Sequence, residues 1–141
     1  MNVEVFERPT NYVTKKMKFA PVLTIPNGVT DVSFYEKAFG AFELRRFGND
    51  DGSVHVAEFQ LDEDTLFHLH ESTNRSSQSP SSAGTTTVTI GLFVDDVDAF
   101  MEKAKAAGAV VVSPAQDYDY GYRQGNVVDP FGHNWQIQKA I

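Results

Sequence analysis

The segment DVSFYEKAFGA at residues 31–41 is echoed by DVDAFMEKA at residues 96–104, and each runs on to a Gly-Ala pair. A repeat of this kind indicates two copies of one structural unit. In both segments the apolar residues recur three and four positions apart, and a glycine follows. This pattern predicts two amphipathic helices, each of which ends at a glycine.

Strand-like runs surround both predicted helices. One run precedes each helix and three follow it, with turns rich in Asn, Asp, Gly and Pro between them. We therefore predict an α+β fold of two tandem βαβββ modules, which form a curved mixed sheet with the helices on its outer face and a ligand cavity on its inner face. The predicted strands are 18–25, 42–47, 54–61 and 65–70 in the first half, and 86–94, 110–113, 124–129 and 134–139 in the second.

The chain divides into four segments at these boundaries. Residues 1–16 are an N-terminal extension, 17–71 the first module, 72–85 a linker and 86–141 the second module. The linker is rich in serine and lacks a hydrophobic pattern, so we expect it to be exposed and mobile. Together the two modules make one domain.

Alternation along the strands predicts which face binds a ligand, because successive side chains point to opposite faces. Phe67 and Leu69 share one face and His68 the other, while Trp135 and Ile137 lie opposite Gln136. We assign the apolar face to the helices. The mixed face, with hydroxyl, imidazole and amide groups, then has the character of a small-molecule site.

Composition excludes several classes of function. The chain of 141 residues carries a net charge of −7, which disfavours nucleic-acid binding, and has no cysteine for disulfides, thiol chemistry or zinc. We find no apolar run of about 20 residues and no secretory signal pattern. The sequence therefore predicts a cytoplasmic protein that binds a small organic molecule, and neither a nucleic acid nor a membrane.

The segments FYEKAFGA (residues 34–41) and YGYRQGNVVDPFGHNW (residues 120–135) carry a family resemblance. Over about residues 17–141 the chain resembles the vicinal oxygen chelate superfamily of glyoxalases, bleomycin-resistance proteins and dioxygenases, and within it the PhnB-like branch. The resemblance implies a homodimer. Its motifs are specific for the fold and weak for the function.

The resemblance also implies where a metal would bind. The superfamily's enzymes typically hold a divalent metal through four positions, which fall here on Ala20, His68, Thr89 and Gln136. Ala20 offers no donor atom and a threonine hydroxyl is a poor ligand. We therefore expect no cofactor; if a metal binds, His68 and Gln136 would hold it.

Further residues are candidates for the site, each with a structural alternative. Glu58 is a candidate catalytic base among apolar neighbours, or an edge residue that points to water. Arg123 and Tyr120 lie in a tyrosine-rich segment, where the guanidinium binds a carboxylate or phosphonate ligand or pairs with a nearby aspartate. His70 shares the face of His68, and Phe93 is a candidate wall of the cavity.

These observations leave three hypotheses about function. The first is metal-independent binding of a small molecule near Ala20, His68, Thr89 and Gln136. The second is a metal-dependent lyase, isomerase or dioxygenase, with His68 and Gln136 as ligands and His70 or Glu58 as unorthodox partners. The third is an antibiotic-sequestering protein, in which a flat aromatic pocket traps a cationic drug without turnover.

Overall fold

The computed structural model describes residues 2–10, 17–73 and 77–141. It confirms an α+β fold of two tandem βαβββ modules. The first module consists of β1 (Val22–Ile25), α1 (Phe34–Phe39), β2 (Phe42–Gly48), β3 (Val54–Asp62) and β4 (Thr65–Glu71). After α2 (Pro80–Ala83), the second module consists of β5 (Thr89–Phe93), α3 (Val97–Ala106), β6 (Val110–Tyr118), β7 (Tyr122–Val128) and β8 (Asn134–Ala140).

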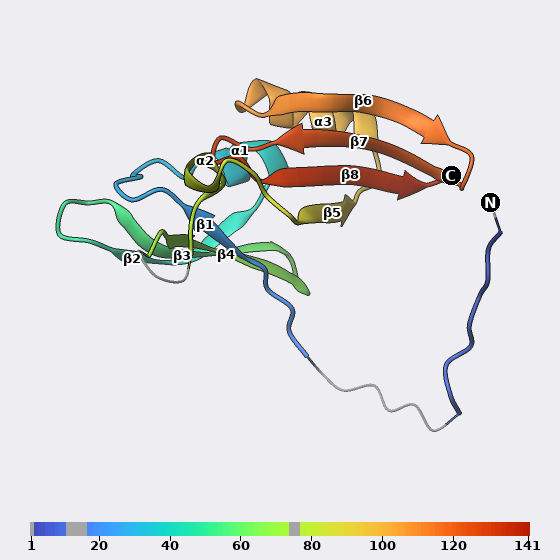
Figure 1. Ribbon diagram of the computed structural model, residues 1–141, viewed down its shortest axis with the longest axis horizontal. Helices are drawn as coiled ribbons and strands as arrows, with labels where there is room; N and C mark the ends of the chain where they lie inside the picture. Colours follow the sequence, from blue (N-terminus) through green and yellow to red (C-terminus); the bar gives the residue numbers. More distant parts are fainter. Residues whose placement is uncertain (1, 11–16, 74–76) are drawn as a thin grey trace.

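Within the chain the strands form two four-stranded sheets, in the orders β1-β4-β3-β2 and β5-β8-β7-β6. The first strand of each module runs parallel to the last, and the other pairs are antiparallel. Figure 1 shows the two sheets as separate layers, with α1 between them. Strands β1 and β5 are therefore edge strands, whose outer backbone groups have no neighbouring strand in the sheet.

The repeated segments form the helices that the sequence predicts. Gly40 ends α1 with φ of 67°, and its N–H donates to the carbonyl oxygen of Glu36 at 3.0 Å. The left-handed conformation is accessible to glycine at little cost. At the start of α3, the Asp96 carboxylate accepts a hydrogen bond from the Ala99 N–H at 3.0 Å. Both helices bury their apolar faces, as expected.

One aromatic core joins the helix-bearing faces of the two sheets. Phe67 from the first sheet and Trp135 from the second lie with ring centroids 5.6 Å apart, and both are fully buried. Tyr35 and Phe39 of α1 pack against Trp135 at 6.1 Å and 4.8 Å. The predicted apolar face is thus confirmed in both modules, and these faces meet each other.

The Asp129 carboxylate connects the modules inside this core. It lies between β7 and β8, is only 4% exposed, and accepts four hydrogen bonds. Oδ2 accepts from the Tyr35 hydroxyl at 2.6 Å and from Trp135 Nε1 at 3.0 Å. Oδ1 accepts from the backbone N–H groups of Phe131 at 2.9 Å and His133 at 3.0 Å. A buried carboxylate is tolerated because donors surround it.

The connector between the modules is exposed at residues 81–85 but is packed at its centre. It contains the short helix α2, and Ser79, which precedes that helix, is fully buried. Pro80 packs so closely on Gly132 that a Cβ at position 132 would lie 2.8 Å from the Pro80 Cβ. Gly132 also has φ of 93°, so this position requires glycine both for the close approach of Pro80 and for its left-handed backbone. This part of the linker is therefore packed against the turn before β8.

No helix within the described residues has the length and apolarity needed to cross a membrane.

Tyr35→Phe is expected to lower the free energy of unfolding by about 1.5–3 kcal/mol, because the buried carboxylate of Asp129 loses one donor. Asp129→Ala is expected to cost more, since the buried donors of Tyr35 and Trp135 then lose their acceptor. Urea denaturation followed by Trp135 fluorescence measures both values. Tyr118→Phe, on a half-buried tyrosine at the end of β6, is the control and should change stability by less than about 0.5 kcal/mol. Equal stability of Tyr35→Phe and the parent would contradict the assigned role.

Stability should also fall above about pH 10 in a way that depends on Tyr35. Burial, and then the adjacent Asp129 carboxylate, raise the pKa of the Tyr35 hydroxyl well above its ordinary value of 10.0. The folded chain therefore keeps a proton that the unfolded chain releases, so the free energy of unfolding decreases as the pH rises. Urea denaturation between pH 8 and pH 11 should show a shallower decrease for Tyr35→Phe. Parallel curves would contradict this linkage.

Candidate functional site

The face of the second sheet opposite the helices, which points outward within one chain, carries a row of side-chain amides. Gln138 pairs with Phe93 on β5 and with Gln124 on β7, and Gln124 pairs with Gln116 on β6. Gln136 lies beside Gln138 on the same strand face. We call this surface the amide face, defined by Phe93, Tyr122, Gln124, Gln136 and Gln138.

Hydrogen bonds order the amides into a chain. Gln138 Oε1 accepts from Gln124 Nε2 at 2.7 Å and from Gln136 Nε2 at 2.9 Å. Tyr120 donates its hydroxyl proton to Gln124 Oε1. In the described part of the chain, Gln136 Oε1 and Gln138 Nε2 have no hydrogen-bond partner, so the amide face presents one acceptor and one donor on neighbouring side chains.

Aromatic rings line the amide row at one end. Phe93 lies 5.9 Å from Tyr122 between ring centroids, Tyr122 lies 5.9 Å from Tyr120, and Tyr120 stacks on Tyr118 at 5.3 Å. Phe93 is 67% exposed, so its ring is available to a ligand. The structure thus brings four predicted site residues, Thr89, Phe93, Tyr120 and Gln136, to one side of the second sheet.

The outer face of the first sheet carries the other predicted residues. His68 pairs with Val22 on β1 and with Glu58 on β3, and Glu58 pairs with Arg45 on β2. We call this surface the histidine face, defined by Arg45, Glu58, His68 and His70. Glu58 forms a bidentate ion pair with Arg45 at 3.1 Å for both bonds. The structure therefore gives Glu58 a partner that the sequence did not indicate, and this pairing does not support a free catalytic base.

Arg123 lies on the helix side of the second sheet and not on the amide face. Its guanidinium donates two hydrogen bonds to Asp98 of α3, both at 2.8 Å, and one to Asp117 at 3.0 Å. The hydrogen bond from Arg123 lowers the pKa of Asp98. Of the two interpretations of Arg123, the structure favours pairing with nearby aspartates, and its binding of a ligand has no support in this geometry.

The amide and histidine faces point away from each other within one chain. Phe67 contacts Trp135 across the core, and the next residue on each strand, His68 or Gln136, points to the opposite side. His68 and Gln136 therefore do not line one cavity within this chain, and a cavity floor shared by both residues would need a second copy. Ala20 precedes β1, which begins at Val22, and Val22 is the residue that pairs with His68.

The four positions implied for a metal do not fit one. Two of them lack a good donor, and His68 and Gln136 lie on opposite outer faces. Among residues 2–10, 17–73 and 77–141, no group of three or more His, Asp or Glu side chains is arranged to hold a metal ion. We therefore derive no chemistry through a metal at these positions.

A cavity of about 640 Å³ lies between the edge strands β1 and β5. Its volume is in the range of small-molecule sites, and its lining is mainly apolar. Thr89 lines it, together with Val88 of the connector, but His68 and Gln136 do not. We call it the edge cleft; its lining includes Phe19, Pro21, Leu23, Val88, Ile90 and His133.

Sequence reasoning missed one polar cluster altogether. His55 on β3 lies against His70 and Glu71 at the end of β4, with the two imidazole ring centroids 5.0 Å apart. Residue spacing in the sequence does not indicate this pair, because His55 lies at a register shift in the pairing of β2 with β3. Asn27 and Asn49, from separate turns, also bind Glu71.

Comparison with known families agrees with this architecture. The signature of the Glyoxalase/Bleomycin resistance protein/Dioxygenase superfamily matches residues 30–137, which include α1, α2 and α3 and β2–β7. The chain belongs to this superfamily.

The chain is also similar to individual members. An uncharacterized protein of Mycobacterium tuberculosis is 37% identical over 125 residues, which cover 86% of this chain and 74% of that protein. A solved structure of TioX from Micromonospora superposes with a TM-score of 0.65 and 25% identity, over 87% of this chain and 99% of TioX. An Arabidopsis thaliana gene product gives the same TM-score with 27% identity, over 87% and 98% of the two chains.

A more distant structure shows the fold alone. The fosfomycin resistance protein FosX of Mesorhizobium loti superposes with a TM-score of 0.60 but is only 12% identical, over 91% of this chain and 95% of FosX. The superfamily membership therefore fixes the fold and leaves the specific activity open.

Proposed function

We propose that the chain binds a small, planar organic molecule on the amide face, without a metal at the four superfamily positions. The observation that carries this proposal is the free acceptor of Gln136 and the free donor of Gln138 beside exposed aromatic rings. A donor and an acceptor side by side are complementary to a lactam or amide edge, and Phe93 and Tyr122 offer ring surfaces for stacking.

We further propose that a second copy of the chain completes the site. The amide face is open, and the histidine face that would close it points the other way in the same chain. The unpaired edges of β1 and β5 flank the apolar edge cleft, which a second copy would cover. In a two-fold dimer, the histidine face of one copy lies opposite the amide face of its partner.

The enzymatic and antibiotic-sequestering alternatives differ from this proposal in their requirements. A lyase, isomerase or dioxygenase of the superfamily's metal-dependent type needs donor atoms that Ala20 and Thr89 do not supply. Sequestration of a drug needs only the aromatic surface, so it is a special case of binding on the amide face. The alternatives are separated by whether binding needs a metal and by whether it needs a hydrogen-bonding group on the ligand.

The lactam 2-quinolone should bind more tightly than quinoline, which has the same ring system without the lactam N–H and carbonyl. Gln136→Met removes the free acceptor and should weaken 2-quinolone binding roughly three- to tenfold, as expected for one hydrogen bond, with quinoline little changed. Ligand-observed NMR titration with and without EDTA measures both. Arg123→Gln, on the opposite side of the sheet, is the matched control. Equal affinity for both compounds, or loss of binding in EDTA, would contradict the proposal.

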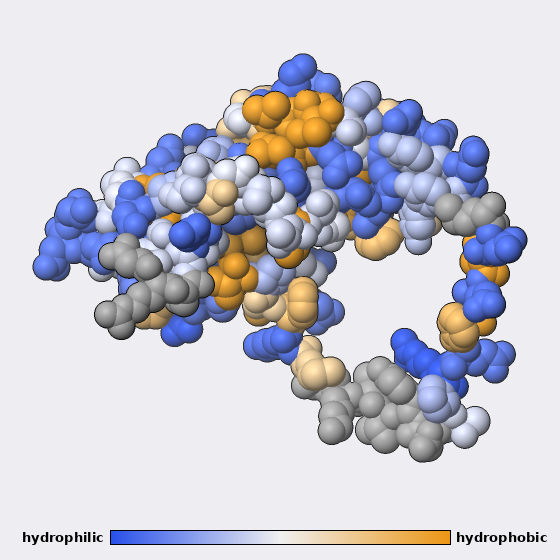
Figure 2. Space-filling model, in the orientation of Figure 1, coloured by the Kyte–Doolittle hydropathy of each residue, from blue (hydrophilic) through white to orange (hydrophobic). Residues whose placement is uncertain are grey.

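The chain should sediment with twice the mass of one chain at concentrations of tens of micromolar. Val88 is 62% exposed and lines the edge cleft, so Val88→Glu should place an unpaired charge in the interface and shift the species toward the monomer. The control is Val112→Glu, at an exposed valine of β6 that does not line the edge cleft. Figure 2 shows an apolar patch at the top of the molecule, the side on which Figure 1 draws β6. A parent that sediments as a monomer, or dissociation only in the control, would exclude this dimer.

A further inference from the structure

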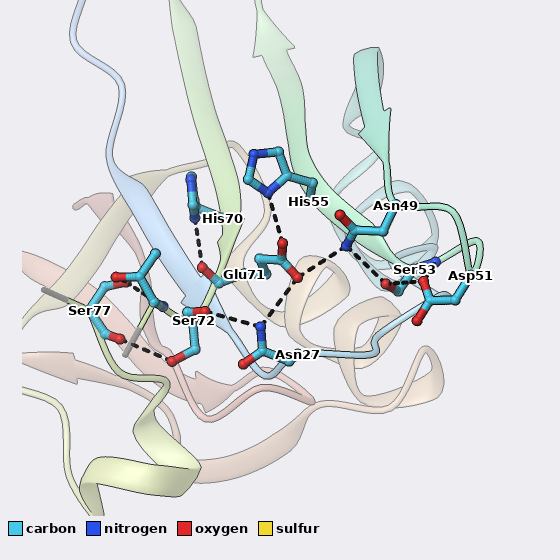
Figure 3. A network of polar contacts seen from close by, with 10 residues as sticks. Asn27, Asn49, Asp51, Ser53, His55, His70, Glu71, Ser72 and Ser77 are labelled. Carbon is cyan, nitrogen blue, oxygen red and sulfur yellow. Dashed lines mark hydrogen bonds and ion pairs between the residues drawn. The ribbon is translucent and has the colours of Figure 1, made fainter. Parts of the chain in front are cut away.

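Two histidines and a glutamate at one end of the first sheet form a cluster that shares no residue with the amide face (Figure 3). His55 Nδ1 lies 2.8 Å from Glu71 Oε1, and His70 Nδ1 lies 2.6 Å from the backbone oxygen of Glu71. Carboxylate and carbonyl oxygens only accept hydrogen bonds, so Nδ1 of each ring carries the proton. The Nε2 atom of each neutral ring then has a free lone pair.

A β-bulge places His55 in this cluster. Phe47 pairs with Val56 and Gly48 with Val54, so His55 is an extra residue without a partner on β2. Bulges redirect the side chain of the extra residue. His70 of β4 pairs with Val56 of β3, the residue after His55. The centroids of the His55 and His70 rings are 5.0 Å apart.

Glu71 is held in place by residues from two turns. Its Oε2 accepts hydrogen bonds from Asn27 at 3.2 Å and from Asn49 at 3.1 Å, and Asn49 also donates to Ser53 Oγ at 3.0 Å. The acceptor that orients His55 is therefore fixed by hydrogen bonds from both turns.

The spacing of the two rings matches that of imidazoles that share one metal ion. With Nε2 about 2.0–2.1 Å from a tetrahedral ion, the centroids of two ligating rings lie about 5 Å apart. The observed distance is 5.0 Å and the rings are inclined by 66°, so they are not stacked. In Figure 3 both outer ring nitrogens lie on the side away from the oxygens of Glu71.

We propose that Nε2 of His55 and Nε2 of His70 bind one divalent cation of the borderline class, Zn²⁺, Ni²⁺ or Cu²⁺, with water in the remaining positions. Imidazole suits these ions, whereas Mg²⁺ and Ca²⁺ prefer oxygen ligands. Metal-binding histidines commonly donate their other N–H to a carboxylate or a backbone carbonyl, and Glu71 supplies both acceptors. The site shares no residue with the four superfamily metal positions, and it stands or falls independently of ligand binding on the amide face.

Calorimetric titration of the full-length, tag-free protein with Zn²⁺ tests this site. The chain has four histidines, and His55, His68 and His70 are replaced in turn. His55→Ala and His70→Ala should each weaken Zn²⁺ binding at least about tenfold. Glu71→Gln should weaken it about 10- to 100-fold, as expected when a histidine loses its orienting carboxylate. His68→Ala is the matched control and should remain within about twofold. Mg²⁺ should give no binding.

A second measurement separates this site from others. Cu²⁺ electron paramagnetic resonance should show two imidazole nitrogens in the parent and one in His55→Ala or His70→Ala, if each variant retains the parent's circular dichroism. Zn²⁺ binding lost in His68→Ala and retained in His55→Ala would overturn the proposal, as would the absence of Zn²⁺ binding up to about 1 mM. Neither result bears on 2-quinolone binding, which is measured in EDTA.

Discussion

The arrangement of the whole chain depends on a carboxylate that neither module can bury alone. Asp129 comes from the second module and takes two donors from its own turn and one from Trp135, but Tyr35 comes from the first. A charge this deep in a protein is stable only with its donors in place. Tyr35 must therefore enter the second module's core, which draws α1 between the two sheets. The helix-bearing faces then meet, and the amide and histidine faces are left on the outside.

Much of this architecture could be predicted from local signals in the sequence. The repeat, the glycine at position 40 and the alternation of residues 67–69 and 135–137 each depend on neighbours along the chain. The structure departs from the predicted elements where contacts between residues distant in the sequence determine the local conformation. The first residue of α2, Pro80, packs on Gly132, about 50 residues away. β6 extends past the predicted residue 113 and through Pro114, since β6 is an edge strand whose outer N–H groups need no partner.

The candidate site could be predicted only in part, for the same reason. Alternation indicated that Gln136 lies on the face opposite Trp135 and Ile137, and the structure agrees. The partners of Glu58 and Arg123 could not be inferred, because Arg45 and Asp98 approach them only in the folded sheet. His55 was missed because a bulge cannot be read from alternation. The homodimer, the cytoplasmic location and the PhnB-like branch stay predictions.

The contact between Pro80 and Gly132 also bears on how such chains change in length during evolution. It fixes the distance between the connector and β5, because Pro80 is held on the second module before that strand begins. Residues gained or lost ahead of Ser79 leave this distance intact, whereas a deletion after α2 would displace β5 from β8. Length variation among homologous connectors should therefore concentrate on the side of the first module, and the segment from Pro80 to Thr89 should keep a constant length.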